Sequence, residues 1–217
     1  MVKAASLTIK KKYWFPIVAP QELGGEKIGE SYLGDPQEGV GRTLSVSVLT
    51  VTGDPSKQSL HLDFKITSVD KNMLRTEVTG FNIITSAARK MMRRGKEKIE
   101  DSFVVNTKDN QHVRVKPILI TKNKTTSAVL QNLRHHMRAH IIKLVGDLTY
   151  LEFVNNLITH RVQKQLQDIL RKVYPLTVCE IRWMGTEPEG VPIKESVPPP
   201  LATSQKEEEQ EAVEASA

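Results

Sequence analysis

Cysteine is almost absent from this chain of 217 residues, and aromatic residues are scarce. Because Cys179 is the single cysteine, a disulfide framework within the chain and a zinc site built from several cysteines are excluded. Phe, Trp and Tyr make up only 5% of the residues, so we expect Leu, Ile and Val to provide most of the buried core. The low cysteine content favours a cytosolic or nuclear location.

Long apolar segments are also missing. The longest runs without a charged residue, Thr43–Gly53 and Val78–Ala88, are 11 residues each, whereas a membrane-spanning helix needs about 20 apolar residues. The first residues, Met1–Ala5, lack the apolar stretch of a secretory signal. We therefore predict a cytoplasmic protein without a membrane partner.

Positive charge is abundant and unevenly distributed. Residues 1–185 hold 29 Lys and Arg against 17 Asp and Glu, a difference of +12, whereas residues 186–217 hold two lysines against eight glutamates, a difference of −6. A basic body attracts polyanions because each cation on a phosphate releases a condensed counterion. Nucleic acid is one such partner, and membranes and acidic proteins are the alternatives that basic patches also serve.

The composition divides the chain into three regions. Residues 1–12 are expected to form a basic N-terminal arm, and residues 13–185 a single RNA-binding domain. Residues 186–217 are rich in Pro and Glu and contain too few apolar groups to offset the entropy of ordering. We therefore predict a disordered, acidic C-terminal tail.

Periodicity predicts an α+β fold. Alternating apolar and polar residues indicate strands over residues 43–52, 60–66, 73–79, 103–107, 112–120 and 176–183. Helical spacing indicates a short helix from a cap at Thr85 or Ser86 to Ile99, and a longer helix from about Ser127. Two more helices are expected, one opened by a capping box at residues 149–152 and one around residues 162–173.

Sequence motifs of enzymes and cofactor sites are not found. The chain has no GxxxxGK[ST] phosphate loop and no GxGxxG after a strand. His136 and His140 have the i, i+4 spacing of zinc ligands, but no carboxylate follows nearby, and Arg134 and Arg138 would repel a dication. Cys179 alternates with apolar residues, which is typical of a buried structural thiol. We predict no catalytic residue, no metal and no cofactor.

Basic clusters remain as candidates for function. The densest cluster is Arg89–Lys98. A continuous helix would place its cations on about three turns, and bound phosphates would relieve the repulsion between them. The loop Lys122–Thr126 adds lysines and small polar residues that can bond phosphate oxygens. The aromatic cluster Tyr13–Phe15 is expected to pack on the core, with base stacking as the less favoured alternative. The predicted RNA-binding residues are Lys10, Lys11, Lys12, Trp14, Lys57, Arg89, Lys90, Arg93, Arg94, Lys96, Lys98, Arg114, Lys116, Lys122, Lys124, Arg134, His135 and Arg138.

Two alternative functions were weighed against structural RNA binding. An RNA-processing enzyme would need a carboxylate or histidine cluster facing the basic surface, and the sequence offers no convincing one. A free-standing RNA chaperone would need aromatic residues on strands for base stacking, and the strand candidates Phe64 and Phe103 are expected in the core. We therefore expect contacts with the backbone and shape of RNA rather than base readout.

Several segments occur in an order and at a spacing that match a known family. They are Lys12–Pro20, Ile28–Glu30, Gly41-Arg42, Thr52–Gln58, Thr107–Asp109, His112–Pro117 and Tyr174–Leu176. Together they resemble the small-subunit ribosomal proteins of archaea and eukaryotes called the S-three-a-e (e-S-one) family. The family's glycine-containing turn after Lys-Asp is replaced by Asn110-Gln111, and we expect the hairpin to be kept because Asn tolerates positive φ.

The resemblance has implications for fold, partners and location. It implies a β-barrel-like antiparallel sheet flanked by helices and embedded in small-subunit ribosomal RNA. It also implies a position on the platform of the small subunit, near the messenger exit and the 3′ end of that RNA, beside other platform proteins. Initiation factor three and messenger RNA are the further partners it implies, with nucleolar assembly if the cell is eukaryotic.

Overall fold

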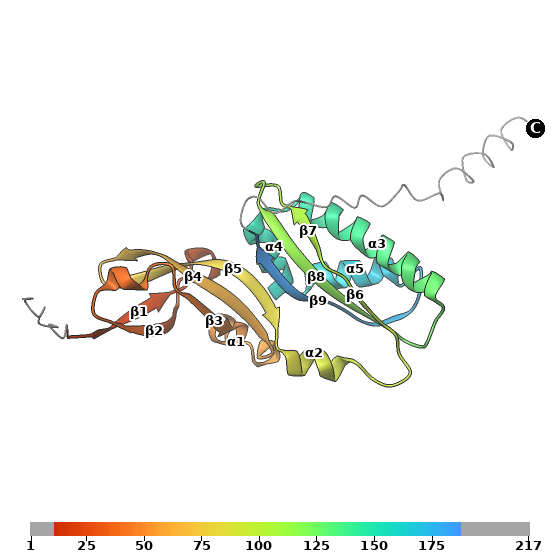
Figure 1. Cartoon of the computed structure of the whole chain (residues 1–217), viewed down its shortest axis with the longest axis horizontal. Helices are drawn as coiled ribbons and strands as arrows, with labels where there is room; N and C mark the ends of the chain where they lie inside the picture. The colour runs from red at the N-terminus through yellow and green to blue at the C-terminus, as the bar shows by residue number, and fades with distance from the viewer. Residues whose placement is uncertain (1–10, 188–217) are drawn as a thin grey trace, which may run out of the picture.

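The computed structural model describes residues 11–187. Lys10, most of the expected N-terminal arm and nearly all of the expected acidic tail lie outside the described residues. Within this range, nine strands form one mixed sheet beside five α-helices, so the predicted α+β class is confirmed. The molecule is elongated, with strands β1–β5 in one half and β6–β9 with α3–α5 in the other (Figure 1).

The N-terminal half contains five strands and one short helix. Their bounds are β1 Tyr13–Val18, β2 Lys27–Leu33, β3 Thr43–Ser47, α1 Val48–Thr52, β4 Leu60–Asp70 and β5 Met73–Ile83. The strand order is β2-β1-β5-β4-β3, and the strands curve around buried side chains such as Phe15, Leu62 and Leu74 (Figure 1). The pairing of β1 with β5 is parallel, so the sheet is mixed rather than antiparallel throughout.

The C-terminal half is built around β8. Its elements are α2 Thr85–Met91, β6 Lys98–Glu100, β7 Phe103–Asn106, β8 His112–Thr121, α3 Ser127–Gly146, α4 Tyr150–Ile158, α5 Arg161–Leu170 and β9 Leu176–Thr186. β8 pairs with β9 on one edge and with β6 and β7 on the other. Met137 of α3 and Leu166 of α5 share the core with Val115 of β8, so these helices cover one face of the strands.

A single strand, β5, joins the two halves. Leu74 and Arg75 of β5 pair with β1, whereas Gly80–Asn82 pair with β9. At this junction Gly80 lies opposite Gly185. A Cβ atom on Gly80 would lie 3.0 Å from the carbonyl oxygen of Met184, a backbone atom that cannot move aside easily. The absence of a side chain at Gly80 therefore permits the close approach of β5 and β9.

Most predicted strands are confirmed, but three strands were missed and one expected strand is half helix. β1, β2 and β6 were not predicted, and the expected strand 43–52 ends at Ser47. The Ser47 hydroxyl accepts a hydrogen bond from the Leu49 N–H at 3.3 Å, which caps α1. Gly53 then ends α1 in a left-handed conformation with φ of 70°.

The predicted short basic helix is wrong in both its length and its cap. α2 ends at Met91, and Ile99 lies in β6 opposite Leu119 of β8. Gly95 adopts φ of 81°, a left-handed conformation that a helix cannot continue through. The N-cap residue is Ile84, with no side-chain cap bond. The cations of residues 89–98 are therefore divided among a helix, a turn and a strand.

Three local predictions are confirmed. Thr149 and Glu152 make both hydrogen bonds of the capping box that opens α4. Asn110 adopts φ of 58° in the turn between β7 and β8, so the hairpin is kept without glycine. Cys179 is buried, and burial raises the pKa of its thiol to about 12.

We predict that Gly80→Ala lowers the free energy of unfolding by about 1–3 kcal/mol, the usual cost of overpacking. The added Cβ would press on the Met184 carbonyl oxygen and on the Asp63 carboxylate. Gly29→Ala is the matched control, because Gly29 lies in β2 with nothing within 4 Å of its Cβ position. Urea unfolding followed by circular dichroism measures both variants. Equal midpoints for the two variants would contradict this account of the junction.

We also predict that His160 makes a pH-dependent contribution to the free energy of unfolding. His160 is the N-cap residue of α5 and has φ of 56°. Its Nδ1 lies 3.6 Å from Glu180 Oε2, and this carboxylate raises the pKa of His160, against the opposing effects of burial and of Lys57. A raised folded-state pKa stabilises the protein below about pH 6.5, and the stabilisation is lost as pH rises through the folded-state value. His160→Asn keeps a residue that tolerates this φ.

Wild type should therefore lose more of its unfolding free energy between pH 5.5 and pH 8.5 than His160→Asn does. Urea unfolding at a series of pH values measures the difference between the two proteins. A difference that is constant across this range would show that the His160–Glu180 contact does not stabilise the fold.

Candidate nucleic-acid interface

Loops from distant parts of the sequence meet at one end of the C-terminal half, which we call the basic end. The Thr121 N–H donates to the Glu97 carbonyl oxygen and the Lys122 N–H to the Pro175 carbonyl oxygen, both at 3.0 Å. Lys96 Nζ donates to Thr177 Oγ1 at 2.9 Å. These bonds hold residues 92–97, 122–126 and 171–175 together. The cations of the basic end are Arg93, Arg94, Lys96, Lys122, Lys124, Arg171 and Lys172.

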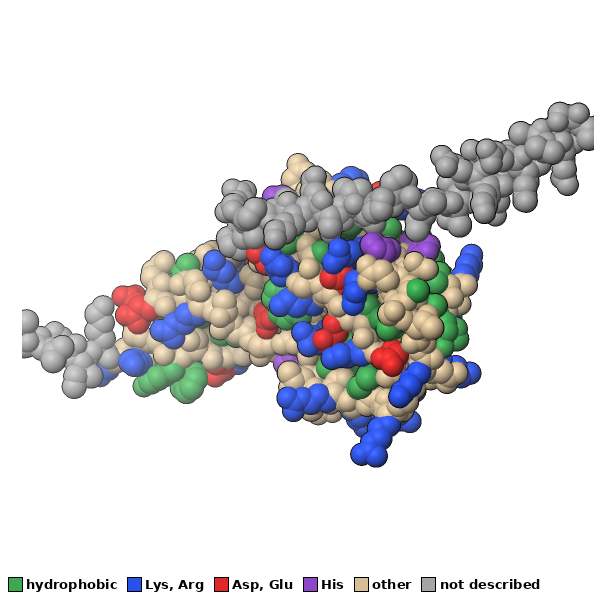
Figure 2. Space-filling view, turned by 45° about the vertical axis from the view of Figure 1, so that its right-hand side comes forward, with side chains coloured by type: hydrophobic (Ala, Val, Ile, Leu, Met, Phe, Trp, Pro, Cys, Tyr) green, Lys and Arg blue, Asp and Glu red, His purple; other side chains and the backbone are tan. Residues whose placement is uncertain are grey.

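The basic end combines two predicted clusters with a third that was missed. Arg93, Arg94, Lys122 and Lys124 are exposed, and Figure 2 shows Lys and Arg side chains projecting from the lower part of this half. Arg171-Lys172 was not predicted. Two adjacent cations after a helix do not by themselves indicate a binding site. It is the pairing of β8 with β9 that places Arg171 and Lys172 beside the other two loops.

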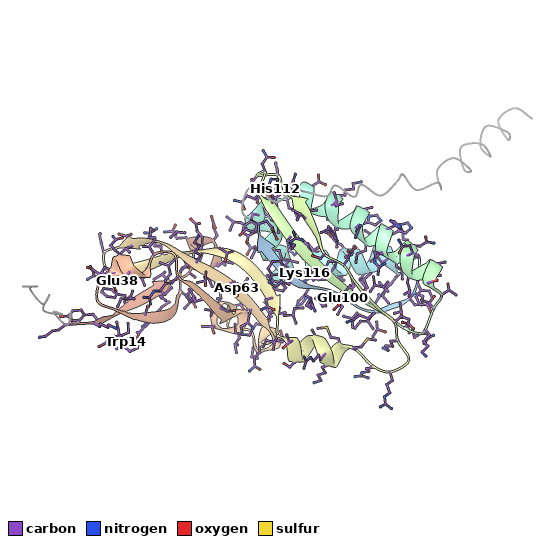
Figure 3. All side chains as sticks on the ribbon, viewed as in Figure 1. Trp14, Glu38, Asp63, Glu100, His112 and Lys116 are labelled. Atoms are coloured by element: carbon purple, nitrogen blue, oxygen red, sulfur yellow. The ribbon has the colours of Figure 1, made fainter. Side chains whose placement is uncertain are left out.

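A second surface is a groove of about 580 Å³ between α2 and the sheet, which we call the α2 groove. Its basic side chains are Arg89 from α2 and three from the strands: Lys98, Lys116 and Arg182. Glu100 is the only carboxylate among its lining residues, and it lies 3.2 Å from Lys98 and 3.4 Å from Arg182. The groove therefore carries an excess of positive charge. Figure 3 labels Lys116 and Glu100 on the neighbouring strands.

An aromatic side chain forms one wall of the α2 groove. The Lys116 ammonium lies 4.4 Å from the centre of the Trp183 ring, a cation–π distance. The ring covers Gly185, where a Cβ atom would lie 2.7 Å from it. Arg182 and Trp183 were not predicted as interface residues, because β9 was interpreted only as a core strand.

Four of the predicted cations already have a carboxylate partner, and Lys98 of the α2 groove, beside Glu100, is one of them. Arg114 pairs with Glu187, and Lys57 lies 3.4 Å from Asp54. Arg138 Nη2 donates to Asp101 Oδ1 at 2.7 Å. Burial opposes ionisation of Asp101, but the bonds from Arg138 and the Ser102 N–H outweigh it and lower the pKa of the Asp101 carboxyl. Arg138 thus ties α3 to the loop after β6.

The outer surface of α3 holds the remaining predicted residues of this half. Arg134 and His135 each contact Gln131, at 3.1 Å. The rings of His136 and His140 are stacked 6.4 Å apart, and burial, His136 and Lys143 lower the pKa of His140. Within residues 11–187 no group of three or more His, Cys, Asp or Glu residues could hold a metal ion. No helix in that range is long and apolar enough to cross a membrane.

Apart from Lys57, which lies just before β4, the described residues predicted in the N-terminal half lie at its far tip. Lys11 and Lys12 are exposed just before β1. Trp14 is 65% exposed and Tyr13 is 59% exposed, so the expectation that the aromatic cluster packs on the core is wrong for both. Only Phe15 is buried. The strand pleat turns Phe15 inward and Trp14 outward.

Comparison with known proteins identifies the family. A profile of the Ribosomal S3Ae family matches residues 2–187. Proteins named small ribosomal subunit protein eS1 are similar: that of Nanoarchaeum equitans is 32% identical over 179 residues, covering 82% of this chain and 90% of the relative. That of Desulfurococcus amylolyticus is 30% identical over 172 residues, covering 79% and 81%. That of Methanothermobacter thermautotrophicus is 30% identical over 174 residues, covering 80% and 89%. The chain belongs to the S3Ae family of small-subunit ribosomal proteins.

Proposed function

We propose that this protein is a structural constituent of the small ribosomal subunit that holds ribosomal RNA through phosphate contacts at the basic end and in the α2 groove. Membership of the family supports the structural ribosomal role. The observation that carries the RNA-binding assignment is the convergence of three loops and seven cations at the basic end. The cations on such a surface repel one another unless bound anions neutralise them.

The exposed cations are available for phosphates. Within residues 11–187, Arg89, Lys90, Arg93 and Arg94 form no ion pair with a carboxylate, and all four are exposed. Arg171 has an exposed partner, Asp168, at 3.8 Å, and such a pair is worth little in water. Binding a phosphate at these positions therefore breaks no strong contact within the protein. Arg114 and Arg138, by contrast, would have to release a carboxylate.

We infer that the α2 groove binds RNA and does not hydrolyse it. Hydrolysis of RNA by acid–base catalysis needs two carboxylates, or a histidine and a carboxylate, that converge on one phosphate. Glu100 is the only carboxylate that lines the groove, and it forms ion pairs with Lys98 and Arg182. Lys116 and Arg89 add positive charge to the groove, which suits binding rather than proton transfer.

The family resemblance extends the proposal to a position in the ribosome. We place the protein on the platform near the messenger exit and the 3′ end of the ribosomal RNA, beside other platform proteins. Initiation factor three and messenger RNA are the proposed transient partners, and assembly in the nucleolus applies if the cell is eukaryotic. Cross-linking of purified small subunits followed by mass spectrometry tests this position, and cross-links only to proteins away from the platform would contradict it.

We predict that the protein sediments with the small ribosomal subunit in a sucrose gradient of native lysate. Because many phosphate contacts act together, the association should survive a moderate salt wash, and it should weaken at high salt as counterions compete. Immunoblotting of the fractions measures the distribution. A peak confined to the light fractions, before any salt wash, would contradict a ribosomal role.

We further predict that replacing Arg93, Arg94, Lys122 and Lys124 with Gln weakens binding to a small-subunit ribosomal RNA transcript. The slope of log K against log salt should fall by about 0.7–0.9 for each lost phosphate contact, or roughly 3 for four contacts. The measurement is RNA binding by fluorescence anisotropy between 50 and 300 mM salt. Circular dichroism checks that the variant is folded.

The matched control for these four substitutions removes the same charge elsewhere. Lys65, Lys108, Lys143 and Lys164 are exposed and lie away from the basic end. Their replacement with Gln should reduce affinity less and leave the salt slope nearly unchanged. Equal slopes for the two quadruple variants would show that net charge, rather than the basic end, binds the RNA.

A further inference from the structure

Two large aromatic side chains lie together on the outer face of the tip, and we call Trp14 and Tyr32 the tip aromatic pair. They are direct cross-strand neighbours in the antiparallel pairing of β1 and β2. Their ring centres are 5.0 Å apart and the rings are tilted by 41°. Trp14 is 65% exposed and Tyr32 is 51% exposed. Large aromatic surface that remains in water on a rigid sheet indicates a partner that covers it.

Positive charge surrounds the tip aromatic pair. The Lys12 ammonium lies 5.9 Å from the centre of the Tyr32 ring. A hollow of about 540 Å³ lies beside Trp14, and Tyr13, Met73 and Lys71 are among the residues that line it. Lys71 belongs to the turn between β4 and β5. The nearest acidic residue on the same face of β2, Glu30, is paired with Lys27. The surface therefore offers exposed ring faces next to lysine ammonium groups.

This combination matches the two parts of a nucleotide. A base stacks on an aromatic ring whatever its sequence, and the adjoining phosphate binds a lysine ammonium. A protein-binding surface of this size would instead be depleted in lysine at its centre. We infer that the tip aromatic pair stacks on an unpaired base of RNA while Lys12 and Lys71 bind the neighbouring phosphates. The inference rests on the proposed RNA-binding function and adds base contact, which the sequence analysis kept only as the less favoured alternative for the aromatic cluster.

The tip lies at the opposite end of the molecule from α3 and the basic end (Figure 1), and Figure 3 shows Trp14 at this tip. One RNA segment that contacts both ends must follow the length of the protein. The two contacts differ in chemistry, because phosphate binding releases counterions and stacking does not. Salt dependence therefore separates them experimentally.

The test uses the full-length protein with a single-stranded 12-nucleotide oligouridine and a blunt RNA duplex of the same length. Trp14→Ala and Tyr32→Ala should each weaken binding of the single strand by roughly 5- to 150-fold, the range that corresponds to about 1–3 kcal/mol per stacked base. The salt slope should stay unchanged, and duplex affinity should change less than twofold. Ile142→Ala is the control, since Ile142 is a large apolar residue that is 40% exposed and lies on α3, at the other end of the molecule from the tip.

A second readout does not depend on loss of affinity. The chain has two tryptophans, so Trp183→Phe leaves Trp14 as the only one, and stacking of a base should quench its fluorescence when the single strand is added. Equal weakening of single-strand and duplex binding by Trp14→Ala would overturn the inference. So would wild-type single-strand affinity in both Trp14→Ala and Tyr32→Ala.

The two failures can be told apart. If the quadruple variant of the basic end loses RNA affinity while the Trp14 and Tyr32 variants do not, only the tip inference fails, and the aromatic pair is then a surface for a protein. If wild type shows no salt-dependent RNA binding at all, the proposed function fails, and the tip inference fails with it.

Discussion

The close approach of β5 and β9 is the contact on which the arrangement of the molecule depends. One edge of β5 pairs with β4 along its length. The other edge pairs first with β1 and then with β9. The second part of that edge is available to β9 because Gly80 lacks a side chain where the Met184 carbonyl approaches. One continuous sheet therefore holds the tip and the basic end at a fixed separation. The proposed phosphate and base contacts at the two ends are therefore carried by one continuous sheet.

The pairing of β8 with β9 has a similar effect on charge. This pairing places the turn after α5 beside the loop after β8. There the Lys122 N–H donates a hydrogen bond to the Pro175 carbonyl oxygen. Cations separated by about fifty or more positions in the sequence then share one surface. The repulsion between them is a cost in the free protein, and the proposed phosphate contacts would relieve it. Relief of this repulsion would add to the free energy of RNA binding in the proposed complex.

The sequence predicted the parts of the fold that alternation or local capping dictates, and missed those that tertiary pairing dictates. β4 and β8 were found because apolar and polar residues alternate along them, and α4 because its capping box is local. β1 and β2 were missed because short runs containing Pro16 or Gly29 lack a strand signal. That omission concealed the exposed Trp14 and Tyr32. The basic cluster was found but placed on too long a helix, because Met92 is already extended and the left-handed Gly95 follows it.

Ion pairs sort the cations of this basic chain into two groups with different roles. Arg138 is bound to Asp101, whose pKa is lowered, and it ties α3 to the strands. Removing it would leave a half-buried carboxylate without its partner, so its loss should act on stability first. Arg93 and Arg94 are exposed in a turn, and their charge contributes nothing to packing. Such residues repel one another in the free protein without adding to its packing, and the proposed contact with a polyanion accounts for their presence.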